Sequence, residues 1–213
     1  MNRKQFLLAK YQVFNPNLTK VQTIGDYDLF LGMESEYNFI KQKDIELHLI
    51  GTIYDWKAPQ SLENDLLGNL IKCKTISVII EMSNQYCGEF ILIVKFKNEL
   101  FIFNDATGQK ELYYDNNFTT FGSQPKLLGS SIELLEHTSE KATTYYQSIT
   151  FTNKHLFVGN TTHKKNIFHL LPNHLININK RCIERFFPTA ALQKKPLKIV
   201  ASESAKMLQG YIS

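Results

Sequence analysis

Three histidines in the last quarter of the chain, His163, His169 and His174, are candidates for holding a metal ion. Zinc sites combine histidines with cysteines, or place two histidines four residues apart on one helical face. The intervals here are six and five residues, and no cysteine stands at a zinc-ligand spacing from them. We therefore interpret the three as structural side chains and expect no metal in this chain.

Candidate nucleophiles and acid–base groups are few. No G-x-S-x-G elbow surrounds a serine, and Ser123 fits better as a hydroxyl that fixes a strand-to-helix turn. The sequence does not decide whether a serine, a histidine and an aspartate come together as a catalytic triad. Asp105 could act as an acid or base, but the cluster Asn104-Asp105-Ala106-Thr107-Gly108 is typical of a turn whose carboxylate binds backbone amides. The cysteines all lie inside the chain: Cys73, Cys87 and Cys182.

The elements that would position such residues centre on residues 88–126. Phe90, Leu92 and Val94 alternate with Ile91 and Ile93, which predicts a strand that is apolar on both faces and lies inside a layered structure. Residues 97–99 break this run and 100–103 resume it, so the two runs are expected to pair as a hairpin. The turn at 104–108, with Gly108 at positive φ, leads to strands at 112–114 and 118–121.

Further strands are predicted at 5–14, 27–31, 45–54 and 174–178. One helix is expected to start at an N-cap Ser61 and to bury Leu62, Leu66 and Leu67. A second is expected over 75–86, and its buried stripe is Ile76, Ile79, Ile80 and Ser83. Short helices are predicted at 125–128, 131–137 and 142–151. Antiparallel hairpins interrupted by a few helices indicate an α+β sandwich.

The residues of the central stretch resemble those of a known family. The order Gly88-x-Phe90, Asp105-x-x-Gly108, Leu112-Tyr113-Tyr114 and Ser123-x-Pro125-Lys126 is similar to the glutamine amidotransferase domain of asparagine synthetases. Gly51 stands in a segment similar to the family's N-G-E-I-Y-N, and Pro172 and His174 stand in one similar to its L-x-P-G-H. The resemblance implies a four-layer αββα sandwich of two antiparallel sheets, the N-terminal-nucleophile (Ntn) hydrolase architecture.

This chain departs from the family where the family carries its chemistry. Glutamine hydrolysis there needs an N-terminal cysteine whose own α-amino group is the base, whereas this chain starts with Met1-Asn2. Gly51 matches the oxyanion-hole glycine, but Ile50 replaces the asparagine donor, and such a loss typically costs about two to three orders of magnitude in rate. Other departures are Asn104 for Arg, Glu111 for Pro, Gln124 for Glu and Asn173 for Gly.

The two substrate clamps of the family are also missing. No R-G-P-D segment is present to bind the glutamine carboxylate, and no S-D-x-E segment precedes residue 75 to bind its amine. With nucleophile, oxyanion asparagine and both clamps absent, we expect no catalytic residue and no glutaminase activity. Gly51 is then a relict oxyanion glycine, and the other matched positions are structural.

Relatives that have lost the nucleophile, such as β-lactam synthetases and lasso-peptide cyclases, resemble this pattern. The resemblance implies a catalytically silent domain that acts as scaffold or substrate-side wall of an ATP-dependent amide-forming protein. ATP and Mg are expected only in a following synthetase domain, because this chain has no S-G-G-x-D-S, G-x-x-x-x-G-K-[ST] or G-x-G-x-x-G motif. Two alternatives stay open: a stand-alone domain that binds a peptide or protein in the relict cleft, and an enzyme of unrelated chemistry on the same sandwich.

The tail differs from the rest in composition. Residues 1–187 are expected to form the amidotransferase-like domain. Residues 188–196 hold two prolines and two adjacent lysines, and 202–212 then carry a helical stripe of Met207, Leu208, Tyr211 and Ile212. We expect 188–213 to be a linker with the first helix of a following domain, or else a helix that packs back.

Composition and charge limit the cellular compartment and the classes of binding partner that we expect. A net charge of +4 is mild, and lysine pairs such as Lys194-Lys195 are typical of solvated faces, so we expect no nucleic acid as a partner. No apolar run approaches the roughly 20 residues that span a bilayer, and the basic start lacks a signal-peptide core. Three unpatterned cysteines favour a reducing, cytoplasmic compartment. Whether the chain forms a homodimer stays open.

Overall fold

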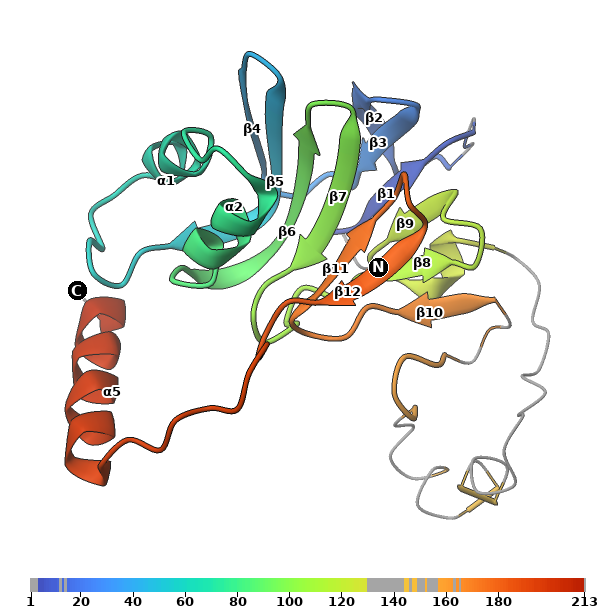
Figure 1. Cartoon of the computed structure of the whole chain (residues 1–213). Helices are drawn as coiled ribbons and strands as arrows, with labels where there is room; N and C mark the ends of the chain where they lie inside the picture. Colours follow the sequence, from blue (N-terminus) through green and yellow to red (C-terminus); the bar gives the residue numbers. More distant parts are fainter. Residues whose placement is uncertain are drawn as a thin grey trace. The chain divides into compact units, whose positions relative to one another are not determined.

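The computed structural model describes residues 4–11, 13, 15–129, 144–145, 147–148, 152, 157–162, 164 and 166–212 (Figure 1). Contacts divide the chain into two compact units, Met1–Met33 with Glu111–Leu171 and Glu34–Lys110 with Pro172–Ser213. Within the described residues each unit holds one six-stranded antiparallel sheet. With the helices of the second unit the fold is α+β, as the sequence predicts.

The first unit is a sheet of short strands. Phe6, Leu8 and Leu29 are fully buried in it, and this burial explains why these segments form strands. The strand predicted over 5–14 ends at Ala9, and Lys10, which follows it, is exposed and pairs with Asp26 at 3.0 Å. In spatial order the strands are β10 (Ile167–His169), β8 (Tyr113–Asp115), β9 (Thr120–Gly122), β1 (Phe6–Ala9), β3 (Tyr27–Leu31) and β2 (Thr19–Ile24).

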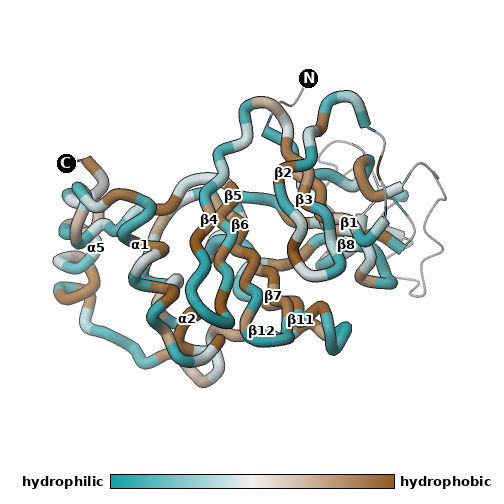
Figure 2. The backbone as a smooth tube through the Cα atoms, turned by 90° about the horizontal axis from the view of Figure 1, so that it is seen from above, coloured by the Kyte–Doolittle hydropathy of each residue, from teal (hydrophilic) through white to brown (hydrophobic). Residues whose placement is uncertain are grey.

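The second unit contains the long central hairpins. Its strands are, in spatial order, β12 (Cys182–Arg185), β11 (His174–Asn177), β7 (Glu99–Asn104), β6 (Cys87–Phe96), β5 (Ile45–Tyr54) and β4 (Tyr37–Gln42). Every residue from Phe90 to Val94 is buried, so β6 is apolar on both faces as predicted. Figure 2 shows this as hydrophobic colouring along β6 and β7.

Two helices cover one face of this sheet. α1 (Glu63–Leu70) and α2 (Ile76–Ser83) share a core cluster with Leu47, Leu92 and Phe103. Leu66, Leu67 and Leu70 of α1 are all at most 1 % exposed, and each buried leucine contributes about 1.5–3 kcal/mol. The predicted N-cap was wrong by one residue: Leu62 occupies that position, its N–H donating to the Asp65 carboxylate, and its side chain is 70 % exposed instead of buried.

The remaining helices are peripheral. A 3₁₀ turn, η1 (Pro125–Leu127), follows β9, as predicted for 125–128. α5 (Leu197–Ile212) starts five residues before the predicted 202, after a segment without regular secondary structure at 188–196. The helix predicted at 131–137 lies outside the described residues, and the one at 142–151 lies largely outside them. Among described residues, no helix is both long and apolar enough to cross a membrane.

Candidate functional site

The Asp105 carboxylate organises the turn after β7. Its two oxygens accept hydrogen bonds from the backbone N–H groups of Thr107, Gln109 and Lys110 and from the Thr107 hydroxyl, at 2.7–3.1 Å. Gly108 follows at φ +69°, a conformation that glycine adopts without steric cost. The carboxylate therefore accepts four hydrogen bonds from its own loop, and the residue is only 2 % exposed. This side chain holds the loop, as the sequence predicts.

The motif positions of the second unit form one continuous set of contacts. Gly51 pairs with Phe90 in the β5–β6 ladder, and the Phe90 carbonyl accepts a hydrogen bond from Asp105 N–H at 2.9 Å. Gly108 then lies against Pro172: a Cβ on Gly108 would stand 2.8 Å from the proline Cγ. The Pro172 carbonyl is 2.9 Å from His174 Nδ1.

Asn173, between Pro172 and His174, has a left-handed backbone conformation. Its φ is +63°, in the left-handed region that asparagine tolerates better than most residues. Its side-chain amide donates to the Ala106 carbonyl at 3.3 Å, which ties the turn to the Asp105 loop. The asparagine therefore stands where the backbone favours glycine.

Gly51 and Gly88 allow β5 and β6 to approach closely. Their φ angles are +101° and +139°. A Cβ on Gly51 would lie 2.1 Å from the Glu89 carbonyl oxygen, and one on Gly88 would lie 2.1 Å from that of Thr52. No other residue type fits either position without moving the backbone. The Gly51 N–H is used as well, since it donates to the Glu36 carbonyl at 2.9 Å.

Next to these glycines lies a pocket of about 490 Å³, which we call the β5–β6 pocket. Tyr54 and Tyr86 supply aromatic surface, and Glu89 supplies a carboxylate that lies 3.7 Å from the ammonium of buried Lys110. Burial raises the pKa of Tyr86. The lining contains no histidine and no arginine, so no lining imidazole stands beside the Cys87 thiol. The full lining is Thr52, Tyr54, Tyr86, Cys87, Gly88, Glu89, Asp105, Ala106, Thr107 and Gln109.

Most motif positions of the first unit make contacts within its sheet and turns. The Ser123 hydroxyl accepts a hydrogen bond from Phe6 N–H at 3.2 Å and so joins β1 to the turn before η1. Leu112 is fully buried, and its carbonyl accepts from Leu170 N–H at 2.7 Å. Tyr113 stacks on His169 at 4.9 Å, and Tyr114 stacks on Phe168 at 5.6 Å. Pro125 opens η1, and Lys126 beside it is exposed.

Two of the three candidate metal-binding histidines, His169 and His174, lie within the described residues. His163 lies outside the described residues. His169 has no hydrogen bond at Nε2, and burial lowers its pKa. Among the described residues no group of three or more His, Cys, Asp or Glu side chains could hold a metal ion.

Sequence reasoning missed one buried polar cluster in the second unit. His48 is fully buried, its Nδ1 lies 2.9 Å from the Tyr37 hydroxyl, and its ring stacks on Phe39. Glu46 lies 3.8 Å from Nε2 and pairs with Lys41 and Lys95. Burial lowers the pKa of His48 to about 4, against the opposing charge of Glu46, and burial raises the pKa of Tyr37 to about 12. The polar His48 and Glu46 within the apolar alternation of β5 were the available signal.

Comparison with known proteins adds no identification: no family model and no curated protein matches this chain.

Proposed function

We propose that this chain is a catalytically silent glutamine-amidotransferase-like domain of an asparagine-synthetase-like, ATP-dependent amide-forming protein. In this role it is a scaffold or substrate-side wall, and ATP with Mg belongs to a following synthetase domain. The proposal includes the finer architecture, a four-layer αββα sandwich of the Ntn-hydrolase kind. A cytoplasmic location and 1–187 as the domain proper are parts of the same proposal.

The observation that carries this proposal is the contact set from Gly51 to His174. Segments separated by more than sixty residues in the chain meet at the motif positions: Gly108 touches Pro172, and Asn173 takes a positive φ where the resembled family has glycine. The packing of α1 and α2 on one face of the second sheet supports a layered arrangement. The engagement of the Gly51 N–H with the Glu36 carbonyl supports the loss of the oxyanion hole.

Glutamine hydrolysis tests the silent site. Purified protein is expected to release no ammonia from glutamine above a heat-inactivated control. It is also expected to resist labelling by an electrophilic glutamine analogue. Because Cys87 lines the β5–β6 pocket, Cys87→Ser is the matched control for adventitious thiol labelling. Ammonia release that Cys87→Ser abolishes would overturn the proposal.

A second candidate is a peptide- or protein-binding domain that uses the β5–β6 pocket. The pocket favours it because two tyrosines stand beside several hydrogen-bonding groups, a combination typical of recognition sites. Immobilised protein is then expected to retain members of a random peptide library, and Tyr54→Ala is expected to lose them. Tyr11→Ala is a matched control, since Tyr11 is 53 % and Tyr54 52 % exposed. Equal retention by both variants would reject the second candidate.

A further inference from the structure

A separate depression lies where two hairpin turns of the second unit meet the loop between α1 and α2. It has a volume of about 420 Å³ and we call it the lysine pocket. The turn between β4 and β5 and the turn between β6 and β7 are tied together there, because Lys97 N–H donates to the Asp44 carbonyl at 2.7 Å. The α1–α2 loop, residues 71–75, supplies the third side.

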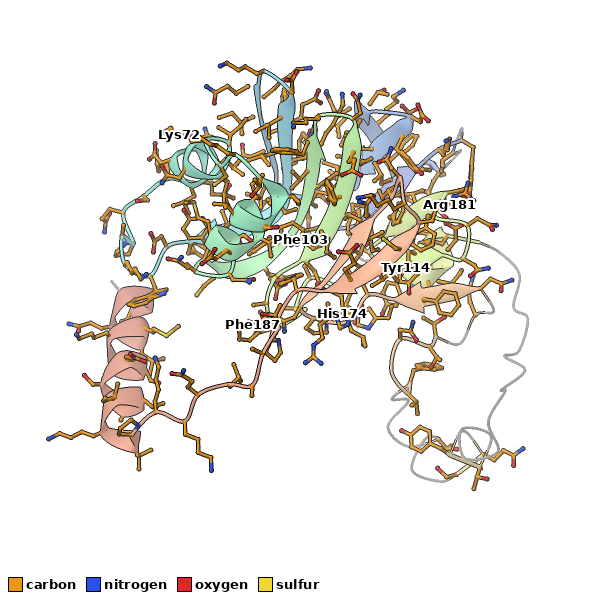
Figure 3. All side chains as sticks on the ribbon, viewed as in Figure 1. Lys72, Phe103, Tyr114, His174, Arg181 and Phe187 are labelled. Atoms are coloured by element: carbon orange, nitrogen blue, oxygen red, sulfur yellow. The ribbon has the colours of Figure 1, made fainter. Side chains whose placement is uncertain are left out.

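Four lysines surround this pocket against one carboxylate, that of Asp44. All four are exposed, and within the described part of the chain none of them pairs with a carboxylate. Lys41 and Lys95 on the neighbouring strands behave differently, since both pair with Glu46. The rim therefore carries a net positive charge that attracts anions. Its lysines are Lys43, Lys72, Lys74 and Lys97, and Lys72 is labelled in Figure 3.

Two of these lysines occupy positions that are costly for their residue type. Lys43 and Lys97 have φ angles of +53° and +56°, at the tips of the two hairpins. Glycine or asparagine would adopt this conformation more readily. The two-residue hairpin turns account for the positive φ, and lysine stands at both positions in place of glycine or asparagine.

The floor of the pocket is apolar. Ile71 is buried, and Ile45 and Phe96 are half-buried and pack against the core under α1 and α2. The Lys97 ammonium lies 5.7 Å from the centre of the Phe96 ring, so charge and apolar surface meet at one point. An occupant of this pocket therefore carries both negative charge and an apolar group.

The lysine pocket continues into a neighbouring pocket. A second pocket of about 580 Å³ shares Lys72, Cys73 and Lys74 with the first. It continues past the α1–α2 loop onto the side of α2, where Val78 is 41 % exposed and Met82 is half-buried, and Asp55 is the one carboxylate among its described lining residues. An extended segment fits this course better than a compact anion.

We propose that the lysine pocket and its extension along α2 bind an acidic peptide segment whose apolar side chain sits on Ile45, Ile71 and Phe96. Charge complementarity selects the acidic residues, and the floor selects the apolar one. A phosphate compound fits less well, because the lining offers no arginine fork and no glycine-rich amide cradle. This inference does not depend on the proposed function, since it uses none of the motif residues; the extension shares only Tyr86 with the β5–β6 pocket.

Fluorescence anisotropy tests the proposal. The probes are a labelled peptide in which glutamates flank leucine and phenylalanine, its glutamine counterpart, and a counterpart with glycine at the two apolar positions. The acidic apolar peptide is expected to bind at least roughly tenfold more tightly than either counterpart, and to weaken as salt increases. Failure to exceed either counterpart overturns the proposal.

Charge-matched variants locate the site. Replacing Lys43, Lys72, Lys74 and Lys97 together by glutamine is expected to weaken binding at least roughly tenfold. The control replaces four exposed lysines that already form ion pairs, and it removes the same charge. If both variants weaken binding equally, attraction is general and the pocket is not the site. Tighter binding of tripolyphosphate or single-stranded RNA than of the acidic peptide would replace the proposed partner class. The control lysines are Lys10, Lys20, Lys180 and Lys195.

Discussion

Gly51 and Gly88 lead to a prediction at the scale of single residues. Each has positive φ and faces a carbonyl oxygen on the opposite strand at a distance that excludes a Cβ. Gly51→Ala and Gly88→Ala are each expected to lower the free energy of unfolding by about 3 kcal/mol or more, because strain and collision add. Urea unfolding measures this.

Gly68 provides the contrasting variant. It lies within α1 with open space around its Cα, so alanine there meets no obstacle. Gly68→Ala is expected to raise the free energy of unfolding by about 0.5–1 kcal/mol, the usual helical gain over glycine. Equal losses at residues 51, 68 and 88 would contradict the close-approach explanation.

His48 makes stability depend on pH. Its pKa falls to about 4 from an ordinary value of 6.5 because the ring is buried. Between those pH values the unfolded chain binds a proton that the folded chain does not, so the free energy of unfolding rises with pH. On going down from pH 6.5 to pH 4 we expect a loss on the order of 2–3 kcal/mol from this group.

Two measurements check the role of His48. Its ring resonances in NMR spectra are expected not to titrate between pH 5 and 8 (roughly the range in which an ordinary histidine changes charge). His48→Gln is expected to make the free energy of unfolding nearly independent of pH above 4.5, the ordinary pKa of Glu46. Burial acts to raise the pKa of Glu46, but Lys41 and Lys95 together outweigh it and lower this pKa, so the stability that Glu46 contributes is lost only as pH falls below 4.5. A His48 midpoint near 6.5 would contradict the prediction.

At the scale of elements, the strands that sequence reasoning missed are the edges of the two sheets. β2 and β10 end one sheet, and β4 and β12 end the other. β2 is mostly exposed, so its Thr-Lys-Val-Gln-Thr run lacks the apolar alternation that burial imposes on β3 and β5. Period-two patterns report burial of a face, and an edge strand is fixed by backbone pairing instead.

In the candidate site, too, local features could be predicted from the sequence and features that join distant segments could not. The Asp105 turn could be predicted because an Asx side chain and a glycine act locally. The β5–β6 pocket could not, since it joins Tyr54, Cys87 and Thr107 from separate elements. The lysine pocket was also hidden, because Lys43, Lys72 and Lys97 are far apart in the sequence and meet only through the pairing of β4 to β7 and the position of the α1–α2 loop.

The N-cap of α2 gives a prediction at this scale. The Thr75 hydroxyl accepts a hydrogen bond from Val78 N–H at 3.3 Å and so satisfies one of the free amides at the helix start. Thr75→Ala is expected to lower the free energy of unfolding by about 1 kcal/mol. Ser77→Ala, an exposed position two residues on, is the control and is expected to change it by less than about 0.5 kcal/mol. Equal effects would contradict a capping role.

At the scale of the whole molecule, burial is distributed unevenly. Core residues concentrate in the sheets, α1 and α2, whereas the described side chains from 189 to 209 are all exposed. α5 meets the rest of its unit at Gly210, where a Cβ would lie 1.9 Å from the Trp56 carbonyl oxygen. Few apolar contacts therefore depend on the tail.

Removal of residues 189–213 is accordingly expected to change the free energy of unfolding by less than about 1 kcal/mol, because little apolar surface loses its cover. The single tryptophan, Trp56, is expected to report the loss as a change in its emission. Gly210→Ala is the matched variant: it keeps the helix but forces it off the Trp56 carbonyl, so it should reproduce the emission change. A loss above about 2 kcal/mol on truncation would mean that 188–213 belongs to the folded domain, against the proposed boundary at 187.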